Sequence, residues 1–429
     1  MTTEKKSYAL PIAMMFALFF MIAFVTGLPS PMGVIVAKQF GASSFESNLG
    51  FFANFIAYAF MGIPAGMMLK RIGYKKTALS AITVGFIGVG VQFLSGQAHS
   101  FTVYLIGAFI SGFSMCMLNT VVNPMLNTLG GGGNKGNQLI QFGGSINSVA
   151  ATITPMLVGY LMGAEAGRTI EKANPALFLA MGIFALAFIV LAFVKIPEPH
   201  ITSKTLVKEK DPYGPMSFRH FILGIIAIFV YVGVEIGIPS TANLLMTQPL
   251  VKGGLAMDAA VAGSVVGTYW LLMLVGRLLG AAVGAKISSK LMMGVVSSVA
   301  LVLLVIAIFC PLNVSVSMPA IQSEGGFSFA LVKVPLSVMF FVLCGLCTSV
   351  MWGSIFNLAV EGLGKYTAAA SGLFMVMVCG GGILPLLQGF VADRTNYISS
   401  YWVIVVAVAY MLFYALIGSK NVNKNIVTK

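Results

Sequence analysis

Charged side chains are scarce inside the long apolar runs of this sequence, and two of them stand out. Glu235 is the only acidic residue clearly within such a run, and Arg277 is the only basic residue left within one. An ionisable group at membrane depth is costly to desolvate, so its presence there is a functional hypothesis by default. Glu235 is therefore a candidate for binding and releasing a proton. The alternative is a structural carboxyl that bonds the backbone freed by Pro239, four residues further on.

Amide and aromatic side chains in the same apolar runs form a second group of candidates. Amides both donate and accept hydrogen bonds, which suits a ligand rich in hydroxyl groups, and an aromatic ring can stack on a ligand's apolar face. Asn119 and Asn123 are four residues apart and therefore share one face of a helix. The alternative role for all of them is interhelical hydrogen bonding and packing. The binding candidates are Asn119, Asn123, Gln141, Asn147, Tyr231, Glu235, Trp270, Trp352, Asn357 and Gln388.

Motifs for other kinds of chemistry are missing from the sequence. The three histidines lie in loops or at the ends of apolar runs, which leaves no histidine proton relay. The glycine loop at residues 130–133 lacks the Lys-Ser/Thr of a phosphate-binding loop. Cys344 and Cys347 are one helical turn apart with no second pair, so packing is expected in place of metal or redox chemistry. We expect no metal, no cofactor and no enzymatic activity.

The composition indicates that these residues belong to a membrane protein. Of the 429 residues, 58% are apolar and 9% are charged, whereas a soluble protein carries roughly 25% charged residues. So few charges cannot cover a water-facing surface of this size, and lipid must cover most of it. A transmembrane helix needs about 20 apolar residues, and twelve segments are long enough: residues 8–36, 45–69, 77–95, 101–127, 138–162, 174–194, 220–246, 259–285, 290–311, 334–360, 367–392 and 398–418. The stretch Gly27–Pro31 should break the first of them.

The basic residues predict the orientation of these segments. With the N-terminus in the cytoplasm, 18 of the 25 Lys and Arg residues fall on the inner side and 6 on the outer side, as the positive-inside rule requires. Both termini are therefore expected in the cytoplasm, and the net charge of +13 does not indicate nucleic acid. Lys70 and Arg71 are expected to brace a cytoplasmic gate. Arg277 is assigned to the same gate, with its long side chain snorkelling toward the inner end of its helix.

A weak internal repeat divides the chain. The pattern Ile-x-Pro-x-Leu-x-Gly occurs at residues 153–159 and 383–389, and an Asn followed six residues later by Leu-Gly occurs at Asn123 and Asn357. Parallel repeats of this kind predict two related halves. We expect an all-α membrane protein with twelve transmembrane helices in two pseudo-symmetric six-helix bundles. The expected divisions are an N-terminal bundle at 1–195, a cytoplasmic linker at 196–219, a C-terminal bundle at 220–418 and a short cytoplasmic tail at 419–429.

Nine short motifs, spread over most of the chain, are shared with one family of membrane proteins. They are Ile63-Pro64-Ala65-Gly66, Lys70-Arg71-Ile72-Gly73-Tyr74-Lys75, Asn123-Pro124 with Leu129-Gly130, Tyr231-Val232-Gly233-Val234-Glu235, Gly276-Arg277-Leu278-Leu279-Gly280, Gly362-Leu363-Gly364-Lys365, Ser371-Gly372-Leu373, Gly380-Gly381 and Pro385-Leu386-Leu387-Gln388-Gly389. Through them the chain resembles the fucose–galactose–glucose:proton symporters of the major facilitator superfamily. Two positions depart from that family. It usually has an Asn-Asp pair where this chain has Leu28-Pro29-Ser30, and Glu or Gln where this chain has Asn119.

The resemblance implies transport of a monosaccharide, a hexose or 6-deoxyhexose such as glucose, galactose or fucose, across a bacterial inner membrane by alternating access. Because the family's acids are thought to carry protons or contact sugar, their absence leaves coupling to H⁺, to Na⁺ or to no ion open. The alternative is a sugar-sensing membrane receptor that does not transport. Such receptors tend to gain a long cytoplasmic tail, whereas only about ten residues follow Ser419 here. The expected partners are the sugar and the lipid bilayer, without nucleic acid, and the expected state is a monomer.

Overall fold

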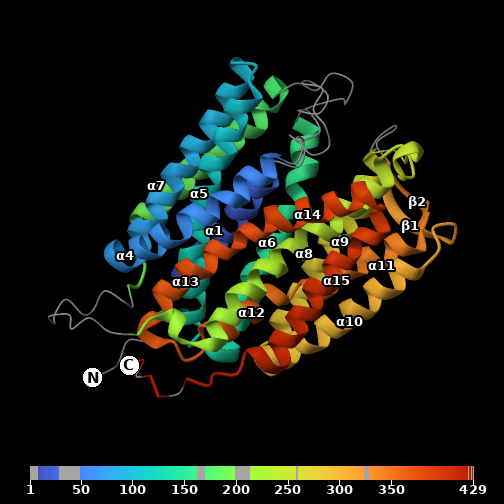
Figure 1. Ribbon diagram of the computed structural model, residues 1–429. Coiled ribbons are helices and arrows are strands. Elements are labelled where there is room, and N and C mark those ends of the chain that lie inside the picture. The colour runs from blue at the N-terminus through green and yellow to red at the C-terminus, as the bar shows by residue number, and fades with distance from the viewer. Residues whose placement is uncertain are drawn as a thin grey trace, which may run out of the picture.

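The computed structural model describes residues 8–28, 49–161, 170–198, 213–257, 259–322, 328–423, 425–426 and 428. Within them the chain is almost entirely helical (Figure 1). The long helices are α1 (Ala9–Gly27), α4 (Leu49–Gln97), α5 (Phe101–Leu129), α6 (Gly133–Leu161), α7 (Asn174–Phe193), α8 (Arg219–Thr247), α9 (Ala259–Val283), α10 (Ser289–Phe309), α11 (Leu336–Thr348), α12 (Met351–Val360), α13 (Thr367–Val376), α14 (Gly380–Arg394) and α15 (Tyr397–Phe413). Short turns at Ile170–Ala173, Pro215–Ser217, Leu250–Lys252, Gly364–Tyr366, Met377–Cys379 and Tyr414–Gly418 complete the helical elements.

The helices account for the twelve expected spans. Among the described residues, 10 segments are long and apolar enough to cross a membrane. One of them, α4, contains two of the expected spans, because its backbone leaves helical geometry at Gly73. The remaining span is α6, which has 29 residues but a more polar composition. The predicted twelve-helix architecture is confirmed, and α1 ends at Gly27 as the sequence predicts; residues 29–36 lie outside the described part.

The turn inside α4 depends on a glycine and on a distant carboxylate. Gly73 has φ 84° and ψ 178°, a conformation that costs little only for glycine. The helix that restarts at Tyr74 begins with backbone N–H groups that have no helical acceptor. Glu198, just after α7, accepts hydrogen bonds from Tyr74 N at 2.7 Å and from Lys75 N at 3.0 Å. A negative charge at the positive end of the helix dipole therefore stabilises this turn.

The helices form two groups that lie side by side (Figure 1). Helices α1, α4, α5, α6 and α7 pack on one another, and helices α8 to α15 do the same. The groups meet along two seams, one where α6 packs on α9 and one where α4 packs on α13 and α14. Since consecutive spans run in opposite directions, the start of α1, the Gly73 turn, the α5–α6 and α9–α10 loops and the end of α15 share one end of the molecule. We call it the terminal end.

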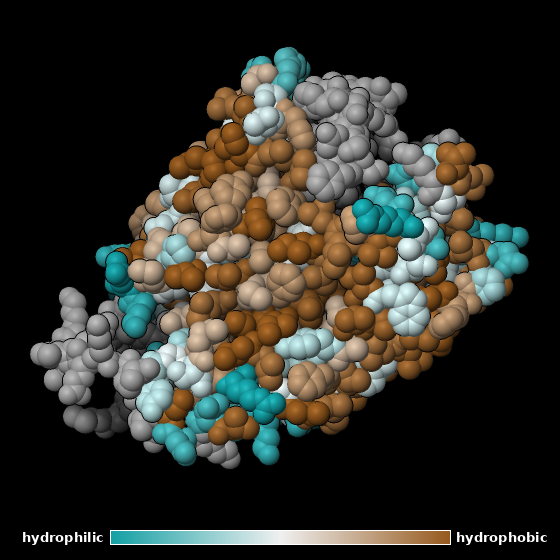
Figure 2. Space-filling model, viewed as in Figure 1, coloured by the Kyte–Doolittle hydropathy of each residue, from teal (hydrophilic) through white to brown (hydrophobic). Residues whose placement is uncertain are grey.

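Apolar side chains cover the outside of both groups. Large residues with high exposure include Phe193 at 83%, Val406 at 69% and Leu186 at 63%. Figure 2 shows hydrophobic residues over the middle of the visible face, with hydrophilic residues gathered toward its ends. Such a surface is stable in lipid and would be unstable in water. The described residues thus have the exterior of a protein that spans a membrane several times.

A β-hairpin is the one element that the all-α expectation omits. Strands β1 (Ser315–Gln322) and β2 (Ser328–Pro335) pair antiparallel between α10 and α11, at the end of the molecule opposite the terminal end (Figure 1). Met318 and Ala320 are buried on one face of β1, while Ser317 and Pro319, which alternate with them, are exposed. This period of two is the strand signal. The hairpin is hard to predict from the sequence because it is short and lies between two strongly apolar helices.

Candidate functional site

The two charged residues singled out from the sequence contact each other. Nη2 of Arg277 on α9 donates a hydrogen bond to Oε1 of Glu235 on α8 at 3.0 Å. The Glu235 side chain is 13% exposed and the Arg277 side chain 8%, so both side chains are largely buried. Each charge offsets the desolvation that the other suffers. The contact supports a charged pair over the backbone-bonding carboxyl considered as an alternative.

Arg277 also joins the two groups of helices. Its Nη1 lies 2.8 Å from both Gly144 O and Ser148 Oγ and 3.3 Å from Asn147 Oδ1, all on α6. Its Nε donates to Ser349 O at 3.2 Å, in the break between α11 and α12. The expectation that this side chain snorkels toward the helix end is wrong. Acceptors inside the protein satisfy all three guanidinium nitrogens, so the side chain has no need of interfacial water.

The asparagines of α5 form a ladder along one helix face. Asn119 donates to the hydroxyl of Tyr58 at 3.1 Å, and Asn123 donates to the Asn119 carbonyl at 2.9 Å. One turn further on, Asn127 donates to Oδ1 of Asn357 on α12 at 3.2 Å. The predicted shared face of Asn119 and Asn123 is therefore present. It continues to a third asparagine, which the sequence analysis did not select although the spacing of four extends to it.

Helix α12 meets this ladder with an indole and an amide. Nε1 of Trp352 donates to Oδ1 of Asn123 at 3.0 Å. Asn357 accepts from Asn127 and donates to the Ser289 hydroxyl at 2.9 Å. Amides with both donor and acceptor groups in use hold two helix groups in register. Three of the predicted ligand-binding side chains, Asn123, Trp352 and Asn357, thus pair across the two groups in this conformation.

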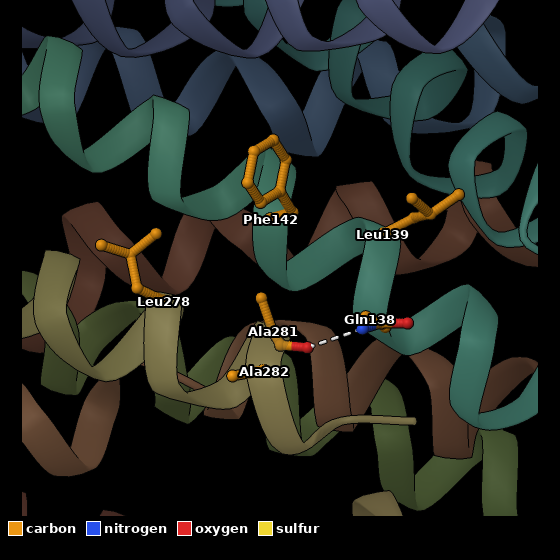
Figure 3. A pocket seen from close by; sticks show the side chains of 6 residues that line it. All are labelled: Gln138, Leu139, Phe142, Leu278, Ala281 and Ala282. Carbon is orange, nitrogen blue, oxygen red and sulfur yellow. Dashed lines mark hydrogen bonds between the residues drawn. The ribbon is translucent and has the colours of Figure 1, made fainter. Parts of the chain in front are cut away.

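Glutamines at the start of α6 add two further contacts between the groups. Gln141 donates to Val350 O on the far group at 2.9 Å. Gln138 donates to Ala281 O on α9 at 2.9 Å, and Figure 3 shows this bond among the residues that line a groove of about 500 Å³ between α6 and α9. Phe142 and Leu139 line the groove from α6, and Leu278 lines it from α9. The groove is therefore lined by apolar side chains together with one hydrogen bond between the two helix groups.

Aromatic residues pack beside Tyr231 on α8 and Tyr269 on α9, the two helices that carry the charged pair. Tyr231, one turn before Glu235, is fully buried and meets the Trp352 ring edge-on, with ring centroids 6.2 Å apart. Trp352 also contacts the Phe374 ring, at 6.1 Å. Trp270 is partly buried and lies against Tyr269, at 5.3 Å between ring centroids. Rings at this depth supply flat apolar surfaces beside the hydrogen-bonding groups.

Three of the remaining predicted residues, Gln388, Lys70 and Arg71, lie apart from this cluster. Gln388 on α14 is completely buried, and a Cβ at Gly237 of α8 would lie 2.6 Å from its Oε1, so it faces a helix neighbour. Lys70 and Arg71 are exposed at the terminal end, next to the Gly73 turn. Asn147 does belong to the cluster: it donates to Phe19 O on α1 at 3.1 Å as well as approaching Arg277.

The residues that sequence reasoning missed are mostly neutral acceptors. Ser148 and the backbone carbonyls of Gly144 and Ser349 complete the environment of Arg277. A serine or a peptide carbonyl carries no sequence signal of its own. Only Asn127 was accessible to pattern reasoning, through its spacing from Asn123. Within the described residues no group of three His, Cys, Asp or Glu side chains could hold a metal ion.

The hydrogen bonds between the two groups use the helix portions nearer the terminal end. They come from the later part of α5, the earlier part of α6, the later part of α9, and α12 with the break before it. The structure is therefore closed at the terminal end. Two groups of helices, joined by a polar interface with a buried ion pair, define a membrane protein whose halves can move against each other.

Comparison with known proteins agrees with this architecture. The family model described as Major Facilitator Superfamily matches residues 14–384. The chain is 28% identical over 425 residues to a protein of Brucella abortus named glucose/galactose transporter, covering 98% of this chain and 97% of that protein. It is 21% identical over 417 residues to the L-fucose-proton symporter of Escherichia coli K12, covering 92% and 89%.

A solved structure shows the same fold. The crystal structure of the Major Facilitator Superfamily transporter FucP in the outward conformation matches with a TM-score of 0.76 at 20% identity, covering 97% of this chain and 100% of that one. The chain belongs to the Major Facilitator Superfamily.

Proposed function

We propose that this protein carries a monosaccharide across the bacterial inner membrane by alternating access, with proton coupling through Glu235. The observation that carries the proposal is the Glu235–Arg277 pair. It lies within the spans, contacts both helix groups and is largely but not completely buried. When an acid in that position gains or loses a proton, the contacts across the interface that must open and close change in strength.

The substrate class follows from the relatives and from the side chains near the pair. The relatives are named for glucose, galactose and fucose transport. Amides suit sugar hydroxyls and aromatic rings suit the apolar face of a pyranose. We assign the sugar contacts to the candidates of the sequence analysis that surround the pair and the asparagine ladder. They are Asn119, Asn123, Gln141, Asn147, Tyr231, Trp270, Trp352 and Asn357. Gln388, toward the outer end of its span, is assigned as an external gate or a further sugar contact.

The proposal includes an orientation and a division of the chain. The excess of basic residues assigns the terminal end to the cytoplasm, with both termini there. Lys70, Arg71 and Arg277 then belong to the cytoplasmic gate. The bundles are taken as residues 1–195 and 220–418, with the linker 196–219 between them and the tail 419–429 after them, and the unit that works is taken as a monomer.

Uptake into proteoliposomes tests both parts of the proposal. Labelled glucose, galactose, fucose and mannose are offered with an imposed pH gradient, with a sodium gradient, or with unlabelled sugar inside the vesicles. We expect uphill uptake of at least one sugar under the pH gradient. Glu235→Gln should abolish uphill uptake but leave counterflow, and Glu171→Gln, the same change at an exposed acid, should alter neither.

Each part has its own contrary result. Uphill uptake that survives in Glu235→Gln removes the coupling role from Glu235. If only the sodium gradient drives uphill uptake, the coupling ion is Na⁺ and not the proton. Binding of a sugar without any counterflow would favour the sugar-sensing receptor over the carrier.

A further inference from the structure

The two seams between the helix groups are built differently. At the α4–α13 seam the backbones touch: a Cβ at Gly62 would lie 2.6 Å from Val376 N and 2.7 Å from Gly372 O. At the α6–α9 seam the helices are joined by side-chain hydrogen bonds, from Arg277 to Gly144 O and Ser148 Oγ and from Gln138 to Ala281 O. Where backbones touch, the contact is lost only if the whole helices move apart. Where side-chain hydrogen bonds join the helices, the bonds can be lost one side chain at a time.

We propose that Arg277 is a latch controlled by the charge of Glu235. While Glu235 is ionised, it fixes the guanidinium where Nη1 holds α6, and the terminal end stays shut. When Glu235 becomes neutral, the guanidinium leaves α6, and the α6–α9 seam opens while the α4–α13 seam acts as the pivot. The proposal rests on the proposed function in one respect, namely that Glu235 is the group that gains and loses the proton.

The charges around Arg277 explain why its counter-ion matters. Its other acceptors are neutral: Gly144 O, Asn147 Oδ1 and Ser148 Oγ on α6, and Ser349 O before α12. Glu235 is therefore the one described acid in contact with it. A buried cation that loses its partner is strongly destabilised, far more than a pair removed together. Protonation of Glu235 thus raises the free energy of the conformation in which Arg277 is bonded to α6.

The other groups that face Glu235 carry no charge, so they do not compete with Arg277 as its ionic partner. Tyr231 on α8 and Tyr269 on α9 interact electrostatically with Glu235, and both are phenols without charge at neutral pH. From α14 and α15, Gln388 approaches Gly237 and the Tyr401 hydroxyl donates to Ile238 O. Both contacts fall on the turn beyond Glu235 and involve uncharged groups. The charge state of the Glu235–Arg277 pair is accordingly set within the pair.

The direction fits a carrier that is loaded from the side opposite the terminal end. In the closed state described here, the Glu235 side chain is 13% exposed, and the terminal end is closed by the contacts of Arg277 and of the glutamines at the start of α6. A proton that reaches Glu235 from the side opposite the terminal end would release the latch and so favour opening at the terminal end. The same proton would leave after the terminal end opens, and the recharged Glu235 would recapture Arg277.

Cysteine accessibility at the terminal end tests the latch. Ala281 is 7% exposed, and Gln138 bonds to its backbone carbonyl, so Ala281→Cys preserves that hydrogen bond. Ala285→Cys, one turn further on at an exposed position, serves as the reference. A maleimide applied from the terminal end labels both, and the ratio of their rates cancels the pH dependence of the thiol chemistry. The protein without an added cysteine gives the background from the five native ones.

We expect Glu235→Gln and Arg277→Gln to raise the ratio of the Ala281→Cys rate to the Ala285→Cys rate at least tenfold over the parent. Arg277→Lys should give an intermediate ratio, because it keeps the positive charge but loses the planar guanidinium with its several N–H donors. Lowering the pH should raise the ratio in the parent but not in Arg277→Gln, a comparison that needs no change at Glu235. A ratio that stays at the parent value in Glu235→Gln, while that variant still performs counterflow, overturns the latch and leaves the carrier intact. A raised ratio in a protein that transports no sugar supports the latch and rejects the proposed substrate.

Discussion

Replacement of Gly62 by alanine should weaken the packing of the two helix groups. The added Cβ would lie 2.5 Å from Val376 Cγ2 and 2.6 Å from Val376 N, whereas ordinary contact begins at 3.4 Å. The side-chain methyl can rotate away, but the backbone nitrogen cannot. Helices α4 and α13 must therefore separate by roughly 0.8 Å, the difference between 2.6 and 3.4 Å, or distort locally.

The cost follows from the close packing of protein interiors. Inserting one methyl group into a filled interface typically costs about 1–3 kcal/mol, which corresponds to roughly a 5- to 150-fold change in an equilibrium constant. The expected result is a lower midpoint of thermal unfolding in detergent and a slower rate of sugar counterflow. Both effects have the same cause, since the seam that is wedged apart is the one on which the groups pivot.

A matched control comes from the same substitution where there is room. A Cβ at Gly182 on α7 would meet nothing within 4 Å, so Gly182→Ala should leave the midpoint unchanged or raise it slightly through helix propensity. If Gly62→Ala has the same midpoint and the same transport rate as Gly182→Ala, the α4–α13 seam is not the close backbone contact described here, and the argument for a pivot fails with it.

Three further predictions concern single contacts. Glu235→Gln and Arg277→Gln should each cost about 3–5 kcal/mol of stability, because each leaves a buried charge unpaired; the double variant should cost less than the sum, and a strictly additive cycle in thermal or denaturant unfolding would contradict the pairing. Trp352→Phe keeps a ring but removes the indole donor, so it should cost about 1–3 kcal/mol through the unsatisfied amide on α5 and weaken sugar binding, measured by ligand-induced thermal shift; unaltered stability would show that the amide finds another donor. Glu198→Ala removes the cap of the helix after Gly73 and should cost about 0.5–2 kcal/mol, whereas Glu171→Ala, at an exposed acid, should cost nothing in the same melts.

The sequence was sufficient for the architecture. Twelve apolar segments are visible because each must be about as long as the bilayer is thick, and that requirement leaves a mark on the composition of every helix. The break after Gly27 was equally visible, because glycine and proline act on the backbone next to them. The β-hairpin was not, since eight-residue strands with ordinary side chains resemble a loop between two spans.

The candidate site was only partly predictable. An acid and a base inside apolar runs are rare enough to be selected from composition alone, and Glu235 and Arg277 were both selected for that reason. Their pairing was not predictable, because residues 42 apart in the chain give no sign of facing each other. The snorkelling expected of Arg277 failed for the same reason: the acceptors that hold it lie outside its own helix, and two of the five are backbone carbonyls.

The sequence by itself determined that this chain lies in a membrane, how many times it crosses, and which few side chains are too polar to face lipid. These properties depend on the free energy of transferring each residue from water to hydrocarbon, which is local to the segment. The tertiary structure alone decided which of the polar groups meet, that Arg277 of α9 is bonded to α6, and that the terminal end is closed. Those outcomes depend on how helices distant in the chain pack, and packing is a property of the assembled pair rather than of either segment.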